Sequence, residues 1–178
     1  MTEKEPLVRI RNLNIIGITD ETEVPIINGV DLDLHRGEVI GLIGESGAGK
    51  STLGLAAMGF TRDGCHIRGG EVTFDGIDLV DAGPEIRREL LGKRIAYVAQ
   101  SAAASFNPAH RIIRQHSEAP MVHSVMPRQQ SEEDAIDLYN RLRLPNPEEI
   151  GFRYPHQVSG GQLQRAMTAM AMSCRPDL

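Results

Sequence analysis

The sequence predicts an α/β fold in which β-rich material comes first and helices fill the second half of the chain. Three observations predict it: apolar and polar residues alternate between positions 7 and 79, a glycine-rich loop follows an apolar segment, and helical spacing begins at Ser131. The chain has 178 residues, of which 40% are hydrophobic and 24% are charged. This composition is that of a globular protein with a sizeable core.

The predicted strands lie in three stretches. Residues 7–15 (LVRIRNLNI) alternate like a strand with one buried face. Residues 27–44 (INGVDLDLHRGEVIGLIG) predict a strand, a turn at 35–37 and then a nearly continuous apolar strand. Residues 69–79 (GGEVTFDGIDL) place Asp75 and Gly76 between two alternating segments, which indicates a hairpin turn.

Two helices are expected in the second half of the chain. Ser131 is expected to cap the first helix, with Asp134 three residues later, and Pro145 to end it. The apolar face of this helix is expected at Ala135, Leu138, Tyr139 and Leu142. The second helix is expected to start near Ser159 and to run through Met172.

A glycine-rich stretch, GESGAGKST at residues 44–52, matches the phosphate-binding pattern G-x-x-x-x-G-K-[ST] between an apolar strand and a helix. Its glycines allow backbone amides to converge on a phosphate at the positive end of the next helix. Lys50 would reach the β- and γ-phosphates, Ser51 would hold Mg²⁺, and Thr52 would add a phosphate contact. The alternative is a surface turn with a solvated lysine. The expected binding residues are Gly44, Glu45, Ser46, Gly47, Ala48, Gly49, Lys50, Ser51 and Thr52.

Two later segments indicate which class of nucleotide-binding protein the sequence resembles. VSGGQLQR, residues 158–165, resembles the signature motif of ATP-binding cassette (ABC) proteins, and YVAQ, ending at Gln100, falls at the family's Q-loop. The helix start there offers a second anion site, although a simple helix cap is the alternative. Its expected binding residues are Ser159, Gly160, Gly161 and Gln162. The resemblance implies that ATP and Mg²⁺ are the cofactors, and that Gln100 acts in catalysis and contacts the metal.

The resemblance also implies a P-loop NTPase core of the ABC ATPase type, with an antiparallel β flank and a helical subdomain that carries the signature. We expect a tail at residues 1–6, the nucleotide-binding core at 7–100 and the helical subdomain at 101–178. In the family, a segment like RPDL at 175–178 is followed by a strand that ends in Asp and Glu, and later by a histidine. On this basis we expect an incomplete core sheet and a chain that binds ATP without hydrolysing it.

Two short segments resemble one branch of the family, the oligopeptide, dipeptide and nickel importers. They are SFNP at residues 105–108 and RYPHQVSGGQ at 153–162. The branch implies an ATP-binding subunit that serves uptake of peptides or a related small solute, on the cytoplasmic face of the inner membrane. Its partners would be transmembrane permease subunits and a second ABC ATPase, identical or different, arranged head to tail. Residues 100–123 are the expected permease-docking surface, with an ordinary exposed loop as the alternative.

Two other function classes stay open: a soluble ABC ATPase without a transport role, and a non-catalytic nucleotide-binding or interaction protein. A net charge of −5 disfavours a general nucleic-acid binder. Without an 18-residue apolar run, we expect membrane association only through partners.

Cys65 and Cys174 are expected to be free thiols. No metal site is expected among the unevenly spaced His110, His116, His123 and His156.

The sequence departs from the family pattern at the nucleobase. ABC proteins usually stack an aromatic side chain on adenine near the end of the first strand, but no Phe, Tyr or Trp precedes Phe60 in this chain. Ile16, Gly17 or Ile18 would have to face the base. We therefore expect apolar contact to replace the stack, at a cost of about 1 kcal/mol in binding.

Overall fold

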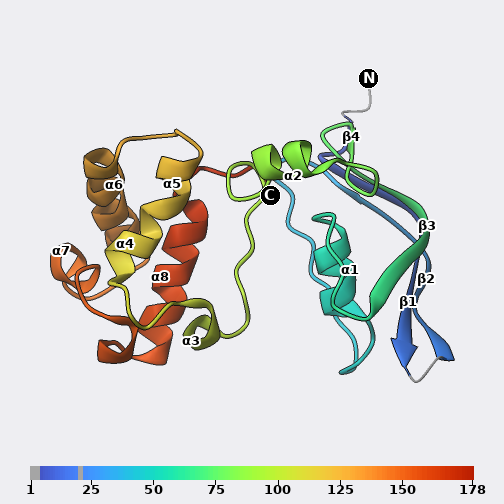
Figure 1. Ribbon diagram of the computed structural model, residues 1–178, viewed down its shortest axis with the longest axis horizontal. Helices are drawn as coiled ribbons and strands as arrows, with labels where there is room; N and C mark the ends of the chain where they lie inside the picture. The colour runs from blue at the N-terminus through green and yellow to red at the C-terminus, as the bar shows by residue number, and fades with distance from the viewer. Residues whose placement is uncertain (1–4, 20–21) are drawn as a thin grey trace. The chain divides into compact units, whose positions relative to one another are not determined.

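The computed structural model describes residues 5–19 and 22–178, and the chain divides into two compact units, Met1–Pro84 and Glu85–Leu178. The first unit holds the β-sheet and helix α1 (Lys50–Ala56), and the second holds most of the helices (Figure 1). The predicted α/β class is therefore confirmed, with β structure first and helices later. Residue 100, the expected end of the core, lies within the second unit.

The first unit is built on one antiparallel sheet with strand order β2-β1-β3-β4. Ile10 of the central strand faces Leu32 on one neighbour and Val72 on the other. Ile10 and Val72 are fully buried, because residues paired across neighbouring strands point to the same face of the sheet, and this face is covered. The strands are β1 (Val8–Thr19), β2 (Thr22–Leu34), β3 (Cys65–Phe74) and β4 (Ile77–Asp78), so the strands predicted at 7–15, before the turn at 35–37 and at 69–79 are confirmed. Strands β1, β2 and β3 each run further than expected.

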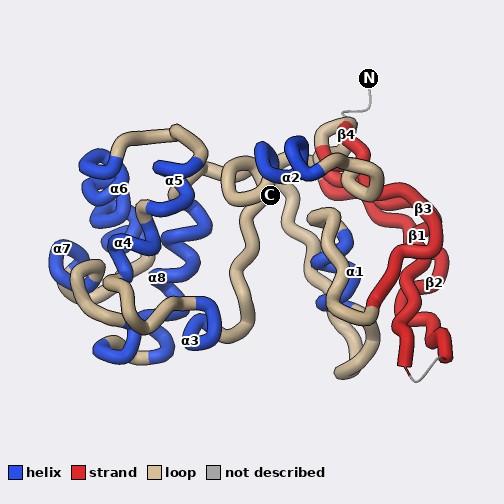
Figure 2. The backbone as a smooth tube through the Cα atoms, viewed as in Figure 1, coloured by secondary structure: helices blue, strands red, loops and turns tan. Residues whose placement is uncertain are grey.

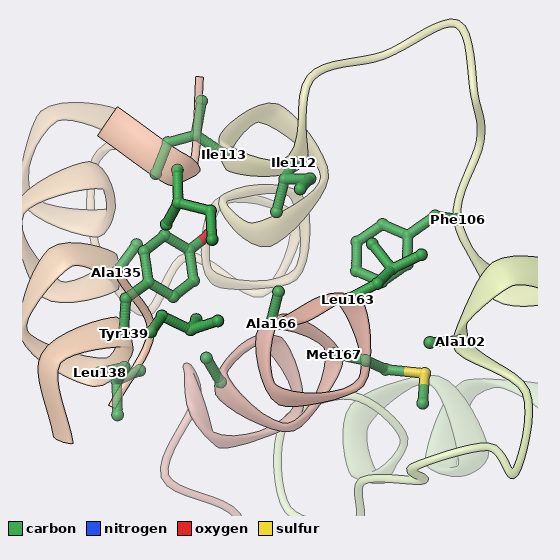
Figure 3. Close-up of a cluster of buried hydrophobic side chains, with 13 residues drawn as sticks. Ala102, Phe106, Ile112, Ile113, Ala135, Leu138, Tyr139, Leu163, Ala166 and Met167 are labelled. Atoms are coloured by element: carbon green, nitrogen blue, oxygen red, sulfur yellow. The ribbon is translucent and has the colours of Figure 1, made fainter. Parts of the chain in front are cut away.

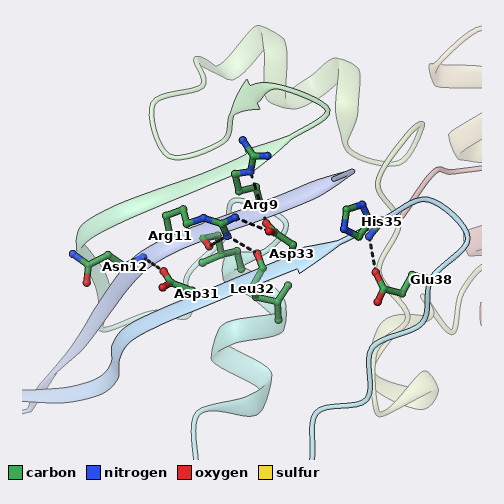
Figure 4. Close-up of polar contacts among 9 residues, drawn as sticks. Arg9, Arg11, Asn12, Asp31, Leu32, Asp33, His35 and Glu38 are labelled. Atoms are coloured by element: carbon green, nitrogen blue, oxygen red, sulfur yellow. Dashed lines mark hydrogen bonds and ion pairs between the residues drawn. The ribbon is translucent and has the colours of Figure 1, made fainter. Parts of the chain in front are cut away.

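A bulge interrupts the sheet after Arg11, where the register of β1 shifts against both neighbours. Asn12 takes a φ of 44°, and Gly70 opposite it takes a φ of 95°. A Cβ on Gly70 would lie 2.6 Å from the Arg11 carbonyl oxygen, so only glycine fits. The Asn12 amide donates to Asp31 Oδ1 at 2.6 Å, and Arg11 Nη2 donates to Asp33 Oδ2 at 2.5 Å (Figure 4). The bond from Arg11 lowers the pKa of the Asp33 carboxyl.

The predicted hairpin turn at Asp75 and Gly76 is confirmed. Both residues have positive φ, 51° and 79°, which is the conformation of a two-residue type I′ turn. The turn joins β3 to β4 and pairs Phe74 with Ile77.

The apolar strand predicted after the turn at 35–37 does not form a ladder. The turn itself is present, because the Glu38 amide donates to the His35 carbonyl at 3.1 Å. Residues 38–45 then run as extended chain without a strand partner among the described residues (Figure 2). Val39 is 93% and Ile43 is 95% exposed. A strand needs a neighbour for its backbone groups, and an apolar pattern on both faces does not provide one.

Most helices of the second unit contribute side chains to one apolar cluster (Figure 3). Figure 3 shows Tyr139 and Ala135 on one side of this cluster, and Ala166 and Ile112 on the other. The helices are α2 (Pro84–Leu90), α3 (Ala102–Ser105), α4 (Ile112–His116), α5 (Glu118–Val122), α6 (Arg128–Arg141), α7 (Pro147–Ile150) and α8 (Gly160–Met172), with a 3-10 turn at Pro155–Gln157.

Helix α6 begins three residues before the predicted cap. Pro127 is its N-cap residue, and the Ser131 amide donates to the Pro127 carbonyl at 3.0 Å, which makes Ser131 part of the first turn. The prediction of Ser131 as the cap is therefore wrong, because the helix starts directly after a proline that already has a suitable φ. Ala135, Leu138 and Tyr139 of the expected apolar face are buried. Leu142, the fourth residue of that face, is half-buried at the C-cap, because the helix ends at Arg141 and not at Pro145.

The C-terminal residue of the chain pairs with the segment that leads to Gln100. The Leu178 amide donates to the Arg94 carbonyl at 3.1 Å, and the Ala96 amide donates to the Leu178 carbonyl at 2.8 Å. These two bonds have the pattern of a parallel pairing between Leu178 and Ile95. Ile95 is 2% exposed, so this pairing is anchored in the unit's interior.

Candidate functional site

The phosphate-loop pattern folds as a closed loop before helix α1. Gly44, Gly47 and Gly49 take positive φ values of 149°, 88° and 78°, which glycine adopts without strain. Lys50 Nζ donates to the carbonyls of Gly44 at 2.9 Å and Glu45 at 2.5 Å. The loop therefore curls around its own lysine, which leaves the ammonium at the centre of the turn.

The two hydroxyl groups that follow Lys50 lie in different environments. Ser51 is exposed, and Thr52 is 6% exposed among the buried residues of α1. An exposed hydroxyl at a helix start fits the Mg²⁺ ligand expected at Ser51. The contact between Thr52 and a phosphate stays a prediction.

Gly49 is the one glycine of the loop that the sheet itself crowds. A Cβ at this position would lie 2.8 Å from Ile27 Cδ1 and 3.1 Å from the Ile26 carbonyl oxygen. Gly47 has a similar φ, but a Cβ there would meet nothing within 4 Å. The loop is therefore seated on β2 at Gly49, and a side chain would push it away.

Substituting Gly49 with alanine is expected to weaken nucleotide binding more than substituting Gly47. Both changes strain a positive φ by about 1–2 kcal/mol, but only Gly49→Ala adds a clash with backbone and with Ile27. Titration of both variants with a fluorescent ATP analogue would measure the difference. Equal losses would contradict the role of the Gly49 contact.

The signature segment forms the start of α8, as predicted. Ser159 Oγ accepts from the Gln162 amide at 3.3 Å, and the Ser159 amide donates to Gln162 Oε1 at 2.8 Å. This reciprocal pair is a capping box, which stabilises the helix start. A Cβ at Gly160 or at Gly161 would meet no atom within 4 Å, so nothing in the described chain requires glycine at either position.

Two side chains of α8 that the sequence did not single out tie the signature to the rest of its unit. Arg165 Nη1 donates to the Arg143 carbonyl at 2.5 Å, after the end of α6. Gln164 Nε2 donates to the Ala99 carbonyl at 3.0 Å, next to Gln100. Both acceptors are backbone carbonyls, which leave no residue pattern by which the contacts could be predicted.

Gln100, the expected Q-loop residue, has an exposed side chain and lies in the second unit together with the signature. The phosphate loop and Ser51 lie in the first unit. The joint action of Ser51 and Gln100 on a metal, and the catalytic role of Gln100, therefore stay predictions.

The three residues expected near the nucleobase differ in exposure. Gly17 is buried between Val24 on β2 and Cys65 on β3, and a Cβ at Gly17 would lie 3.0 Å from Ile26 Cδ1. Ile16 is half-buried, and Ile18 is 46% exposed. Ile18 is thus the candidate whose side chain is most accessible to a base.

A profile of the family described as "ABC transporter" matches residues 27–178. The chain belongs to this family. It is 35% identical to a probable peptide ABC transporter ATP-binding protein of Sinorhizobium fredii, over 97% of this chain and 52% of that protein. It is 38% identical to a dipeptide transport ATP-binding protein of Escherichia coli, over 85% of this chain and 46% of that protein.

The solved ABC proteins share the fold. A dimeric ATP-binding cassette in a post-hydrolysis state, bound to ADP and Pi, superposes with a TM-score of 0.82 at 22% identity, over 95% of this chain and 70% of that chain. The fold is therefore a P-loop NTPase core of the ABC ATPase type, with an antiparallel β flank, a helical signature subdomain and an incomplete core sheet.

The chain spans about half the length of the curated relatives it matches. Members of this family bind ATP with Mg²⁺. In residues 5–19 and 22–178, no helix is long and apolar enough to cross a membrane.

Proposed function

We propose that this chain is part of the ATP-binding subunit of an ABC importer for peptides or a related small solute. The single observation that carries the nucleotide part is the loop at residues 44–52, which closes around Lys50 in front of α1. Membership of the family and the transport names of the relatives support the importer part. MgATP would bind with its phosphates on the loop amides and Lys50, and with Mg²⁺ at Ser51.

The exposed glycines at the start of α8 support a second ABC ATPase as partner. Glycine in a helix is less stable than alanine by about 0.5–1 kcal/mol, and neither Gly160 nor Gly161 is required by its own fold. Bare backbone amides at this helix start would suit close approach by a nucleotide held on another subunit. A head-to-tail pair, identical or different, would bring residues 159–162 of one subunit to the phosphate loop of the other.

Part of the expected docking stretch at residues 100–123 has an apolar surface. Met121 is 46% and Val122 is 69% exposed at the end of α5, while Ile112 and Ile113 of α4 are buried. Exposed apolar side chains over a packed helix suit contact with a permease subunit. The protein would then sit peripherally at the cytoplasmic face of the inner membrane and reach the membrane through this partner.

Gly161→Ala tests the proposal because its two expected effects have opposite signs. The free energy of unfolding is expected to rise by about 0.5–1 kcal/mol, since alanine favours the helix and has free space. The self-association driven by MgATP is expected to fall, because the methyl group covers the amides that would face the partner's nucleotide. Urea denaturation and analytical ultracentrifugation with and without MgATP would measure the two effects.

Gly54→Ala, in the interior of α1, is the matched control. A Cβ at Gly54 also meets nothing within 4 Å, so this variant should gain stability and keep its association. Association that survives in Gly161→Ala would count against the head-to-tail arrangement. A wild-type chain that binds no MgATP would reject the proposed function as a whole.

A further inference from the structure

One side chain joins the signature helix to the peptide group that precedes Gln100. Gln164 of α8 donates from Nε2 to the Ala99 carbonyl at 3.0 Å, across 65 positions of the sequence. That carbonyl belongs to the same planar peptide unit as the Gln100 nitrogen. Holding the carbonyl therefore holds the direction in which the backbone enters Gln100.

The chain is also anchored on the other side of Gln100. Ser101 is the N-cap residue of α3, and Ala102 is 3% exposed within the buried cluster that includes Leu163 and Met167 of α8 (Figure 3). Gln100 itself is exposed. A polar, exposed side chain between two anchored neighbours is presented to solvent in one backbone geometry.

We propose that Gln164 is a positioning residue, which holds Gln100 in fixed relation to the capping box at Ser159 and Gln162. The Gln100 loop and the signature would then move as one part. The inference rests on the proposed function, because the position of Gln100 matters to ligand binding only if the chain binds MgATP. Gln164 itself would not touch the nucleotide.

The test compares MgATP with ATP in the presence of a metal chelator, for the wild-type chain, Gln164→Leu, Gln100→Ala and the double variant. Gln164→Leu keeps the size of the side chain but has no donor. One net hydrogen bond corresponds to about a fivefold change in affinity. We expect MgATP binding to weaken about fivefold in Gln164→Leu, and metal-free ATP binding to change less than twofold. The double variant should bind MgATP no more weakly than Gln100→Ala, because both changes act through one group.

Two further variants guard against a simple folding defect. Gln129→Leu removes an exposed amide on α6 that donates to Glu133, and it should leave both affinities unchanged. Gln164→Glu keeps the length of the side chain but turns a carboxylate toward the Ala99 carbonyl, so it should reproduce the loss for MgATP at pH 8. Thermal unfolding of each variant shows whether the fold is retained.

The outcomes separate this inference from the proposed function. A wild-type chain that does not bind MgATP rejects the proposed function. A wild-type chain that binds MgATP, with Gln164 variants that bind it equally well, rejects only the inference. Equal losses for MgATP and metal-free ATP, or fully additive losses in the double variant, would show a merely structural role and would also overturn it.

Discussion

Lys50→Ala is expected to weaken MgATP binding by about a hundredfold. Lys50 carries the one side-chain positive charge of the loop at residues 44–52, and its ammonium lies within hydrogen-bond distance of the Gly44 and Glu45 carbonyls. A charged hydrogen bond contributes about 1.5–3 kcal/mol, and alanine removes the phosphate contact together with the bonds that close the loop. Isothermal titration calorimetry of the wild-type and variant chains would measure the loss.

Lys93→Ala is the matched control for this prediction. Lys93 is exposed, and its removal changes the net charge by the same amount as Lys50→Ala. We expect Lys93→Ala to bind MgATP as tightly as the wild-type chain does. If Lys50→Ala also kept full affinity, the loop would not be the phosphate site, and the assignment of residues 44–52 would have to be withdrawn.

Acid is expected to destabilise the helical unit through His116. The side chain of His116 is fully buried, and neither of its ring nitrogens has a hydrogen-bond partner in the described part of the chain. The Tyr139 ring packs edge-on against it, with centroids 5.3 Å apart. Burial lowers the pKa of His116 from 6.5 to about 4; the charge of Asp134 opposes this shift, and that of Arg175 adds to it.

The direction of the pH effect follows from which state binds the proton. Between pH 6.5 and pH 4 the unfolded chain protonates this histidine and the folded chain does not, so stability falls as the pH falls through this window. The full contribution is present above pH 6.5. From pH 7.5 to pH 5 we expect His116 to remove about 2 kcal/mol from the free energy of unfolding.

Urea denaturation followed by circular dichroism at the two pH values would test this prediction. His116→Phe keeps an aromatic ring beside Tyr139 without a titrating group. The loss of about 2 kcal/mol that we assign to His116 between pH 7.5 and pH 5 should therefore be absent in this variant. His156→Phe, at an exposed position, should retain the wild-type dependence. A wild-type chain whose stability does not change between pH 7.5 and pH 5 would show that His116 is not buried as a neutral ring in solution.

Local patterns were sufficient to predict much of the fold and of the candidate site. The Asp75-Gly76 turn and the start of α8 at Ser159 depend on residues close in sequence, and both form as predicted. The phosphate loop also forms from neighbouring residues, with Lys50 bonded to carbonyls five and six positions earlier. Each of these features has its chemistry within one short segment.

Features that depend on distant partners could not be predicted from local patterns. The pattern at residues 38–43 is that of a buried strand, but the described chain offers no neighbour to pair with it. The start of α6 depends on Pro127, which outweighs the weaker cap pattern at Ser131. The link from Gln164 to Ala99 ends on a carbonyl, which every residue has. The expectation that this chain binds ATP without turnover stays a prediction.

The exposed, apolar segment at residues 38–43 affects how readily the chain aggregates at high concentration. Val39 and Ile43 are almost fully exposed, and their backbone groups form no strand pairing with the residues that the structure describes. A β-prone, apolar and unpaired stretch of this kind can template intermolecular strand pairing, and Glu38 is its single charged residue. The segment that leads into the phosphate loop is thus also an aggregation-prone surface, and a charged residue placed at Val39 is expected to reduce fibril formation and precipitation.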